Sequence, residues 1–283
     1  MSKGKLLINE LFFYLIAQVF GLLSAWKILQ LPAIQEQISK QKISWFDLIF
    51  SVLIGTAIIL LTLKFLKHKM PYKIFFGFLF FLGIFYTLNI WLTSIPSLIL
   101  TVILFWSHQR WPKIITHNLI ITLTIIWAAI SLGLVISPWQ IIIILLILSL
   151  YDLIAVWKTK HMIKMFKGLA ERGVIFALII PAKIKNLFQS IPEIKPGSEF
   201  LFLGTGDLAL PMIFVISAFR SSCDSWSNSC KFAILPPILI ILGTLLGIVF
   251  INLVMMGKER KPLPALPPLA IGAILGFLIS GLF

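Results

Sequence analysis

The sequence predicts an all-α polytopic membrane protein with about nine transmembrane helices and a cytoplasmic amino terminus. Hydrophobic residues make up 59% of the 283 residues and charged residues only 12%, which is about half the roughly 25% typical of soluble domains. The apolar residues also gather in runs of about 20, the length that a helix needs to cross a bilayer. These two observations predict the fold class, and the placement of the basic residues predicts the orientation.

The apolar runs along the chain are the candidate spans. The first lacks a small-residue cleavage site, so we interpret it as a retained span and not as a signal peptide. The fourth is short enough to be partly re-entrant. Proline lacks a backbone donor and is expected where these helices start or bend, as at Pro96, Pro138, Pro211, Pro236, Pro237 and Pro264. The expected spans are residues 6–26, 46–66, 72–92, 94–107, 113–135, 139–157, 200–219, 232–256 and 264–283.

The basic residues favour one orientation of these spans. If the amino terminus is cytoplasmic, the cytoplasmic segments contain 19 Lys and Arg residues and the outer segments contain 5. Positively charged loops stay preferentially in the cytoplasm, so this orientation is predicted. Lipid headgroups and topology then explain the net charge of +14, and nucleic-acid binding is not expected.

The histidines and cysteines do not form a metal-ligating pattern. The four histidines flank different spans, at positions 68, 108, 117 and 161. We therefore expect no metal ion and no cofactor. Cys223 and Cys230 lie in one short loop on the predicted outer side, where a small disulfide and two free thiols both remain open.

Two aspartates lie well inside apolar runs, whereas Glu10 and Asp47 are expected at segment edges. A carboxylate at such a depth costs roughly 2.5–3.5 kcal/mol on insertion scales, so it is normally retained for function. In the predicted orientation, Asp152 lies about five residues before the cytoplasmic end of its span, and Asp207 about seven residues after the cytoplasmic start of the next. Their depths are then about 8 and 10 Å, so the two carboxyl groups can face each other.

Paired carboxylates can hydrolyse a peptide bond when one activates water and the other, protonated, polarises the carbonyl. Two carboxylates about 3 Å apart cannot both ionise readily, which supplies this division of roles. Gly204 and Gly206 flank Thr205 and would let a substrate backbone or a facing helix approach Asp207 closely. The same glycines could instead be a helix-packing patch. Tyr151 could hydrogen-bond near the site or be an interfacial aromatic residue.

The segment KPLPALPPLA at the start of the last span is the third unusual feature. Pro264, Pro267 and Pro268 remove backbone donors, which predicts non-helical chain until about residue 269. Irregular backbone at membrane depth is tolerated only where it is buried in protein or lines a cavity. This segment also enters from the cytoplasmic side, so it is expected beside the two aspartates.

Three ordered motifs on three spans resemble those of the presenilin and signal-peptide-peptidase superfamily of intramembrane aspartyl proteases. The stretch YDLIAVWKTKHM is most similar to presenilins and their archaeal homologues. One departure is the threonine within the GxGD motif, where leucine is frequent in the family, and this departure affects the expected cleavage preference. The motifs are Tyr151-Asp152, Gly204-Thr205-Gly206-Asp207 and Pro264-Ala265-Leu266-Pro267.

The resemblance implies a presenilin-like bundle over residues 1–283. Residues 1–138 would form a scaffold of five spans, and residues 139–283 would form four catalytic spans with a cytoplasmic connection at 158–199. Asp152 and Asp207 would cut transmembrane substrate helices, and the other motif residues would support the site and the substrate.

The resemblance also implies the partners and the location. The expected partners are single-span membrane proteins and lipids, in a multi-pass protein of the cell membrane. The compact loops favour an enzyme without an obligatory partner subunit, although a homo-oligomer stays open. Signal peptide peptidases resemble the inverse topology, whereas the charge bias matches the presenilin orientation, so cleavage is expected near the cytoplasmic side of the substrate helix.

The apolar stretch VIFALIIP, residues 174–181, is strand-like and too short to span a membrane. We interpret residues near 174–182 as a strand that pairs with an unwound substrate. A re-entrant or interfacial plug is the alternative interpretation.

A second class of function would use the same two acids. Intramembrane carboxylates also serve proton-coupled transporters and cation leak channels, and a proline-broken helix suits a transport site. Transporters commonly contain internal repeats and polar residues spread along a pathway. This chain has no convincing repeat, and its intramembrane polarity is concentrated at one level, which favours the protease.

Overall fold

A computed structural model describes residues 3–31, 44–47, 50, 54, 69–158, 175–191, 199–222, 234–255 and 264–282. This part of the chain is mostly helical. The long helices are α1 (Lys3–Leu29), α4 (Lys69–Trp91), α5 (Ser94–Arg110), α6 (Ile114–Gly133), α7 (Pro138–Leu153), α9 (Thr205–Ser222), α10 (Leu235–Phe250) and α11 (Leu266–Ser280). The shorter elements are π-helices η1 (Ile154–Lys158) and η5 (Ile251–Met255), the 3-10 helix η2 (Ile184–Phe188), and strands β1 (Ala177–Pro181) and β2 (Phe200–Gly204).

Five of the described helical segments are long and apolar enough to cross a membrane by length and composition. α11 is a shorter apolar helix, and the predicted span at 46–66 lies mostly outside the described residues. The described residues therefore confirm a mostly helical fold with apolar helices of membrane-spanning length, to which a small sheet is added. The five segments are Gly4–Leu29, Lys73–Trp91, Ile114–Gly133, Pro138–Lys158 and Leu235–Leu253.

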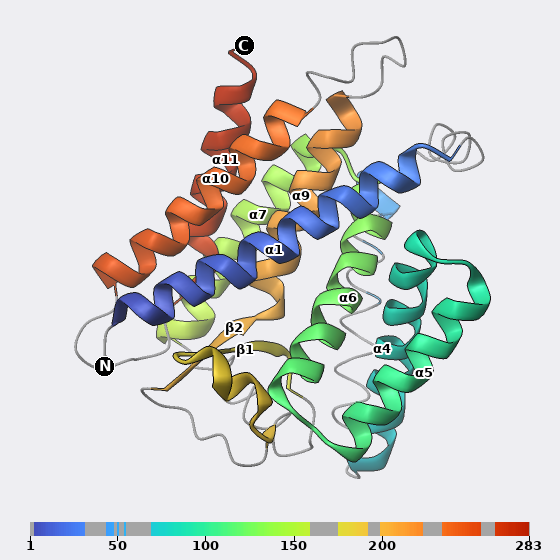
Figure 1. Cartoon of the computed structure of the whole chain (residues 1–283). Helices are drawn as coiled ribbons and strands as arrows, with labels where there is room; N and C mark the ends of the chain where they lie inside the picture. The colour runs from blue at the N-terminus through green and yellow to red at the C-terminus, as the bar shows by residue number, and fades with distance from the viewer. Residues whose placement is uncertain are drawn as a thin grey trace.

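α9 lies at the centre of the bundle and packs against α1, α6, α7, α10 and α11. Nearly every side chain from Pro211 to Phe219 is buried, as expected for a helix surrounded by others. Figure 1 shows α1 crossing this core, α10 and α11 side by side along one flank, and α4 and α5 on the other. The sheet lies at the end of the bundle where α1 begins (Figure 1).

α10 and α11 approach so closely that their backbones touch. A Cβ atom added to Gly243 would overlap the carbonyl of Gly272, and one added to Gly247 would lie 2.7 Å from the carbonyl oxygen of Pro268. Small residues permit such contacts between membrane helices, where dispersion and not the hydrophobic effect drives association. The glycines thereby fix the position of α11 and of its first turn.

Side chains from two helices cap the outer edge of β1. β1 pairs with β2 in antiparallel register, with Ile179 opposite Phe202. On the other edge, the Asn118 amide donates to the carbonyl of Ile179 at 2.8 Å and accepts from its N–H at 2.9 Å. His117 bonds the carbonyl of Ala177 at 3.0 Å, and the Asn9 amide donates to that of Pro181 at 2.8 Å.

This arrangement corrects the interpretation of residues 174–182 as a strand for the substrate. The strand itself is confirmed, but its partner is β2 of the same chain. Its outer edge is already bonded to side chains of α1 and α6. Backbone groups that are paired on both edges cannot accept another strand without losing these bonds.

Two expected helix starts are also wrong. The seventh span was expected to be helical from residue 200, but residues Phe200–Gly204 form β2, and the helix starts at Thr205. The ninth span was expected to be irregular until about residue 269, but α11 starts at Leu266. Proline is tolerated in the first turn of a helix because the N–H groups there have no partner within the helix.

Candidate active site

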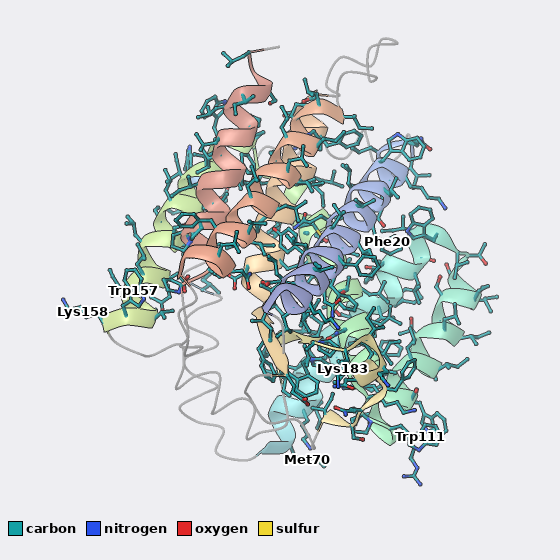
Figure 2. All side chains as sticks on the ribbon, turned by 60° about the vertical axis from the view of Figure 1, so that its left-hand side comes forward. Phe20, Met70, Trp111, Trp157, Lys158 and Lys183 are labelled. Carbon is teal, nitrogen blue, oxygen red and sulfur yellow. The ribbon has the colours of Figure 1, made fainter. Side chains whose placement is uncertain are left out.

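α7 carries Asp152 near its end. The helix starts with a capping box in which the Ser137 side chain accepts from the N–H of Gln140, and the Gln140 side chain accepts from the N–H of Ser137, which satisfies two donors of the first turn. α7 continues into η1, whose terminal Trp157 and Lys158 lie at the periphery (Figure 2). The Asp152 side chain is buried, with 7% of its surface exposed.

A backbone donor of the PALP segment contacts Asp152 directly. The N–H of Leu266 donates to Oδ2 of Asp152 at 3.3 Å. Proline has no N–H, so Pro264 and Pro267 cannot provide this bond. The N–H of Leu266 is available because the first N–H groups of a helix have no intrahelical acceptor. The segment thus supports the site through one specific backbone group.

Asp207 lies in the first turn of α9, directly after β2. The backbone of Gly204 lies close to its carboxyl group and acts on it electrostatically. A Cβ atom added to Gly204 would lie 2.9 Å from Oδ2 of Asp207, whereas one added to Gly206 would meet no atom within 4 Å. The first glycine of the motif therefore makes room for the carboxyl group, and the second leaves open space beside it.

The fold brings the two carboxyl groups together. α7 packs against α9, and the carboxyl group of Asp152 is close enough to act electrostatically on that of Asp207. We refer to these two residues as the aspartate pair. Neighbouring carboxyl groups in an apolar bundle are expected to share a proton, which is the starting arrangement for acid–base hydrolysis.

The remaining predicted site residues divide into those near the aspartate pair and those that point away. Pro264 is buried, and Ala265 and Pro267 are partly buried around the Leu266 contact. The N–H of Thr205 lies 3.4 Å from the carbonyl of Phe176 and so joins the sheet to α9. The side chain of Tyr151 is 58% exposed, so it does not lie on the buried face with Asp152.

A large apolar groove reaches the PALP segment from the outside of the bundle. It has a volume of about 770 Å³ and runs between α10 and α11. Its lining includes Pro264 and Pro267, together with Leu153, the neighbour of Asp152. An apolar side chain in this groove would therefore contact the PALP segment and Leu153.

One buried acid near this site was not predicted. Glu10 was expected at a segment edge, but it lies within α1 with 6% of its surface exposed. Its Oε2 accepts from the Asn252 amide at 2.8 Å, and its carboxyl group acts electrostatically on Asp207. The sequence contained one signal, because Glu10, Tyr14 and Gln18 recur every four residues in an otherwise apolar helix.

The fold and the site define a class of protein. Two carboxyl groups brought together by neighbouring helices of an apolar bundle are the arrangement of an intramembrane aspartyl protease.

Comparisons with known proteins agree with this class. Residues 12–283 match the model of the family described as signal-peptide peptidase, presenilin aspartyl protease. Two solved structures of a presenilin family intramembrane aspartate protease are similar, in the C222 and P2 space groups. The first has a TM-score of 0.65 and 24% identity over 98% of both chains. The second has a TM-score of 0.62 and 21% identity over 96% of both chains. No curated protein sequence matches the chain.

The chain belongs to the signal-peptide peptidase and presenilin family of aspartyl proteases. It is an integral membrane protein with a presenilin-like fold. The family assignment decides between the two classes of function that the sequence left open, in favour of the protease.

Proposed function

We propose that the chain cuts transmembrane helices of single-span membrane proteins with Asp152 and Asp207 as its catalytic residues. The observation that carries this proposal is the pairing of the two carboxyl groups at the junction of α7, α9 and the first turn of α11. Asp152 accepts the N–H of Leu266, and Oδ2 of Asp207 lies against Gly204. These contacts position the two side chains without occupying all of their oxygen atoms.

The chemistry needs one proton in the pair. The ionised carboxylate takes a proton from water while the oxygen of that water bonds to the substrate carbonyl carbon. The protonated carboxyl group gives its proton to the carbonyl oxygen, which produces a neutral gem-diol. When the carbon–nitrogen bond breaks, one diol hydroxyl returns its proton to the pair, and the leaving nitrogen takes a proton from the pair. The pair ends with one proton, as it began.

We also propose nine spans with the amino terminus in the cytoplasm. The 19-to-5 distribution of basic residues supports this orientation. In Figure 2, Met70, Trp111 and Lys183 lie toward one end of the molecule, and in Figure 1 the chain starts toward that end and finishes at the other. Because the aspartate pair lies near the end with the sheet, cleavage falls near the cytoplasmic side of the substrate helix.

We propose that residues 1–283 work as a single membrane domain without an obligatory partner subunit. The packing of α9 supports this, because α1 and α6 of the scaffold contact it and so do α7, α10 and α11 of the catalytic part.

The GxGD threonine, Thr205, stands beside the open space at Gly206. Its side chain is therefore in a position to affect which substrate residues are accepted near the cut.

The test compares the full chain with Asp152→Asn and Asp207→Asn, which keep the size of each side chain. Each protein is reconstituted in lipid vesicles with a labelled single-span substrate, and the products are identified by mass. Cleavage by the parent and its loss in both variants supports the proposal, provided that thermal unfolding is unchanged. Residual cleavage of more than about one per cent in either variant contradicts the assignment of the pair.

The orientation has a test of its own. A protease added outside sealed vesicles or cells should not remove a tag placed at the amino terminus, and it should remove a tag inserted between Cys223 and Cys230. The opposite pattern would refute the cytoplasmic amino terminus.

A further inference from the structure

η2 is a short segment that keeps two large apolar side chains on the outside of the protein. Its Leu187 is buried with Ile114 of α6 and Ile179 of β1, so η2 is held in place by a small core of its own. Ile184 and Phe188, in contrast, are 62% and 60% exposed. A 3-10 helix of five residues is too short to cross a membrane, so these side chains are not the lipid-facing side of a span.

The end of η2 is bonded to the turn between α5 and α6. The N–H of Ile114 donates to the carbonyl of Gln189 at 3.1 Å, and the N–H of Ile191 donates to the carbonyl of Pro112 at 2.8 Å. α6 begins at Ile114 and is long and apolar enough to cross the bilayer, so its start lies where the chain enters the hydrocarbon core. η2 is therefore held at the surface of the membrane, beside the lipid headgroups.

Two tryptophans mark the same level. Trp111, in the turn between α5 and α6, is 52% exposed, and its ring packs edge-on against that of Trp106, with 5.5 Å between the ring centroids. Exposed tryptophans gather at lipid headgroups because the indole ring is apolar and its N–H is polar. In Figure 2, Trp111 and Lys183, the residue before η2, lie toward the same end of the molecule.

Exposed lysines accompany the apolar side chains of η2. Lys183 and Lys185 flank Ile184 along the chain, and Lys113 of the turn pairs with Ser190 in an isolated β-bridge. All three lysines are exposed, and neither the turn nor η2 contains an acidic residue. Apolar side chains among lysines combine the two attractions that bind a protein segment to an anionic membrane. We call the following residues the η2 surface: Trp111, Lys113, Lys183, Ile184, Lys185 and Phe188.

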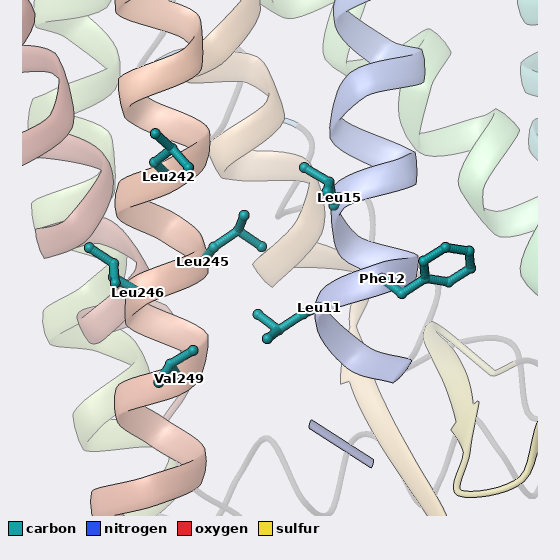
Figure 3. A pocket seen from close by; sticks show the side chains of 7 residues that line it. All are labelled: Leu11, Phe12, Leu15, Leu242, Leu245, Leu246 and Val249. Carbon is teal, nitrogen blue, oxygen red and sulfur yellow. The ribbon is translucent and has the colours of Figure 1, made fainter. Parts of the chain in front are cut away.

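The apolar groove between α1 and α10 lacks this combination. It has a volume of about 400 Å³, and leucine, phenylalanine and valine side chains line it, among them Leu11, Leu15 and Leu245 (Figure 3). Such a groove can hold an acyl chain of any lipid, because its lining offers no charge to a headgroup. Selection among headgroups needs basic side chains at the membrane surface, and the η2 surface has them.

We propose that the η2 surface binds anionic phospholipids in the leaflet on the side of the sheet, which is the cytoplasmic leaflet in the proposed orientation. Ile184 and Phe188 insert among the lipids, and the lysine ammonium groups bind the headgroup phosphates. One acid lies on the neighbouring segment, since the carbonyl of Glu199 accepts from the N–H of Ala182 at 2.9 Å. Its single charge leaves the three lysines in excess.

The bound lipids stabilise the end of the protein that holds the sheet. η2 follows β1 after two residues, and β1 pairs with β2, which continues into the turn that carries Asp207. A ligand that binds only the folded state raises the midpoint of thermal unfolding. Anionic lipid should therefore raise this midpoint through η2.

The first experiment measures whether residue 188 contacts lipid. The full chain carries Phe188→Cys together with Cys223→Ser and Cys230→Ser, and a fluorescent dye is attached to the single thiol. The protein is reconstituted in vesicles of phosphatidylcholine and phosphatidylglycerol. The control carries Glu199→Cys in the same background. The dye at 188 should be quenched more than the dye at 199 by lipids that carry a nitroxide near the headgroup, and less by aqueous iodide. Any other order overturns the insertion of η2.

The second experiment measures the selection of headgroups. The full chain in neutral detergent is titrated with phosphatidylglycerol or with phosphatidylcholine, and native mass spectrometry counts the lipid bound to the intact protein. Lys183→Gln combined with Lys185→Gln should weaken phosphatidylglycerol binding at least about fivefold, because one lysine near an anionic surface contributes about that factor. Binding of phosphatidylcholine should not change.

The matched control removes the same charge from other helices. Lys5→Gln combined with Lys73→Gln replaces exposed lysines of α1 and α4. Its affinity for phosphatidylglycerol should stay within about twofold of the parent, because exposed charges outside a site act on it through screening solvent. Equal losses in the two double variants would show that the lipid responds to net charge alone, and would overturn the inference.

Thermal unfolding gives an independent measurement on the same proteins. Without anionic lipid, both double variants should unfold at the parental midpoint. Phosphatidylglycerol should raise the midpoint of the parent and of the control more than that of the Lys183→Gln, Lys185→Gln protein. An equal rise in all three also overturns the inference. None of these measurements requires cleavage, so their outcome is separate from that of the proposed function.

Discussion

The backbone N–H of Leu266 donates to the Asp152 carboxylate at 3.3 Å, across 114 residues of sequence. This bond explains how the proline-rich start of α11 can hold the carboxyl group of Asp152 on α7 in place. The prolines on either side cannot donate, and the leucine between them can. It also ties the position of Asp152 to that of α11, which the glycine contacts with α10 hold in place.

Replacing Leu266 with proline should therefore impair cleavage through the backbone. Leu266→Pro removes the N–H, and Leu266→Ala removes only the side chain. A hydrogen bond to a charged group contributes about 1.5–3 kcal/mol, so kcat should fall about tenfold or more below that of the alanine variant. Steady-state kinetics in vesicles measure the difference. Equal rates for the two variants would exclude a role for this N–H.

The two glycines of the GxGD motif should respond differently to alanine. Gly204→Ala pushes on Oδ2 of Asp207, which can move at little cost in stability, whereas Gly206→Ala enters open space. A misplacement of about 1 Å can cost up to about 100-fold in rate. We expect Gly204→Ala to lose about 10–100-fold in kcat with an unchanged midpoint of thermal unfolding. Gly206→Ala should also keep the parental midpoint of thermal unfolding, because its methyl group meets no atom of the chain within 4 Å, and a lower midpoint there would contradict the structure.

The cap on β1 should contribute to stability. Asn118→Leu leaves the N–H and carbonyl of Ile179 buried without their partner, and each such group costs about 1–3 kcal/mol. We expect a clear fall in the midpoint of thermal unfolding, measured in detergent. Leu119→Ala is the matched control, because its side chain is 43% exposed, and its midpoint should hardly change.

The contact between α10 and α11 should not tolerate a methyl group. Gly243→Ala places a Cβ atom against the backbone of Gly272, which has no flexible side chain to move aside. Overpacking of this kind costs about 1–3 kcal/mol, and the displaced α11 should also reduce cleavage. Gly4→Ala is the control, because no atom lies within 4 Å of the new methyl group. A Gly243→Ala protein as stable as this control would show that the helices can separate freely.

The sequence predicted helix starts where an apolar run had a proline at its start. Pro138 predicts the start of α7 because proline favours the first turn of a helix. The motifs also predicted that Asp152, Asp207 and the PALP segment would meet.

The boundary between β2 and α9 could not be predicted from the local sequence. Residues FLFLG continue directly into the apolar helix, and a short apolar run does not distinguish a strand from a buried helix. The strand forms because β1, some 20 residues earlier, offers its backbone. A similar limit applies to Glu10, because its partner Asn252 lies 242 residues away. Helical spacing can show that Glu10 faces the same way as Tyr14, but it cannot show what they face.

The length of α11 has a consequence for the surrounding lipid. Its 15 residues rise about 22 Å, whereas the hydrocarbon core of a bilayer is about 30 Å thick. A bilayer beside a short helix becomes thinner or distorted. We therefore expect the headgroups and the water above them to come closer to the protein at α11, beside the start that contacts Asp152, than at the longer helices. The hydrolytic water would then have a shorter apolar distance to cross there.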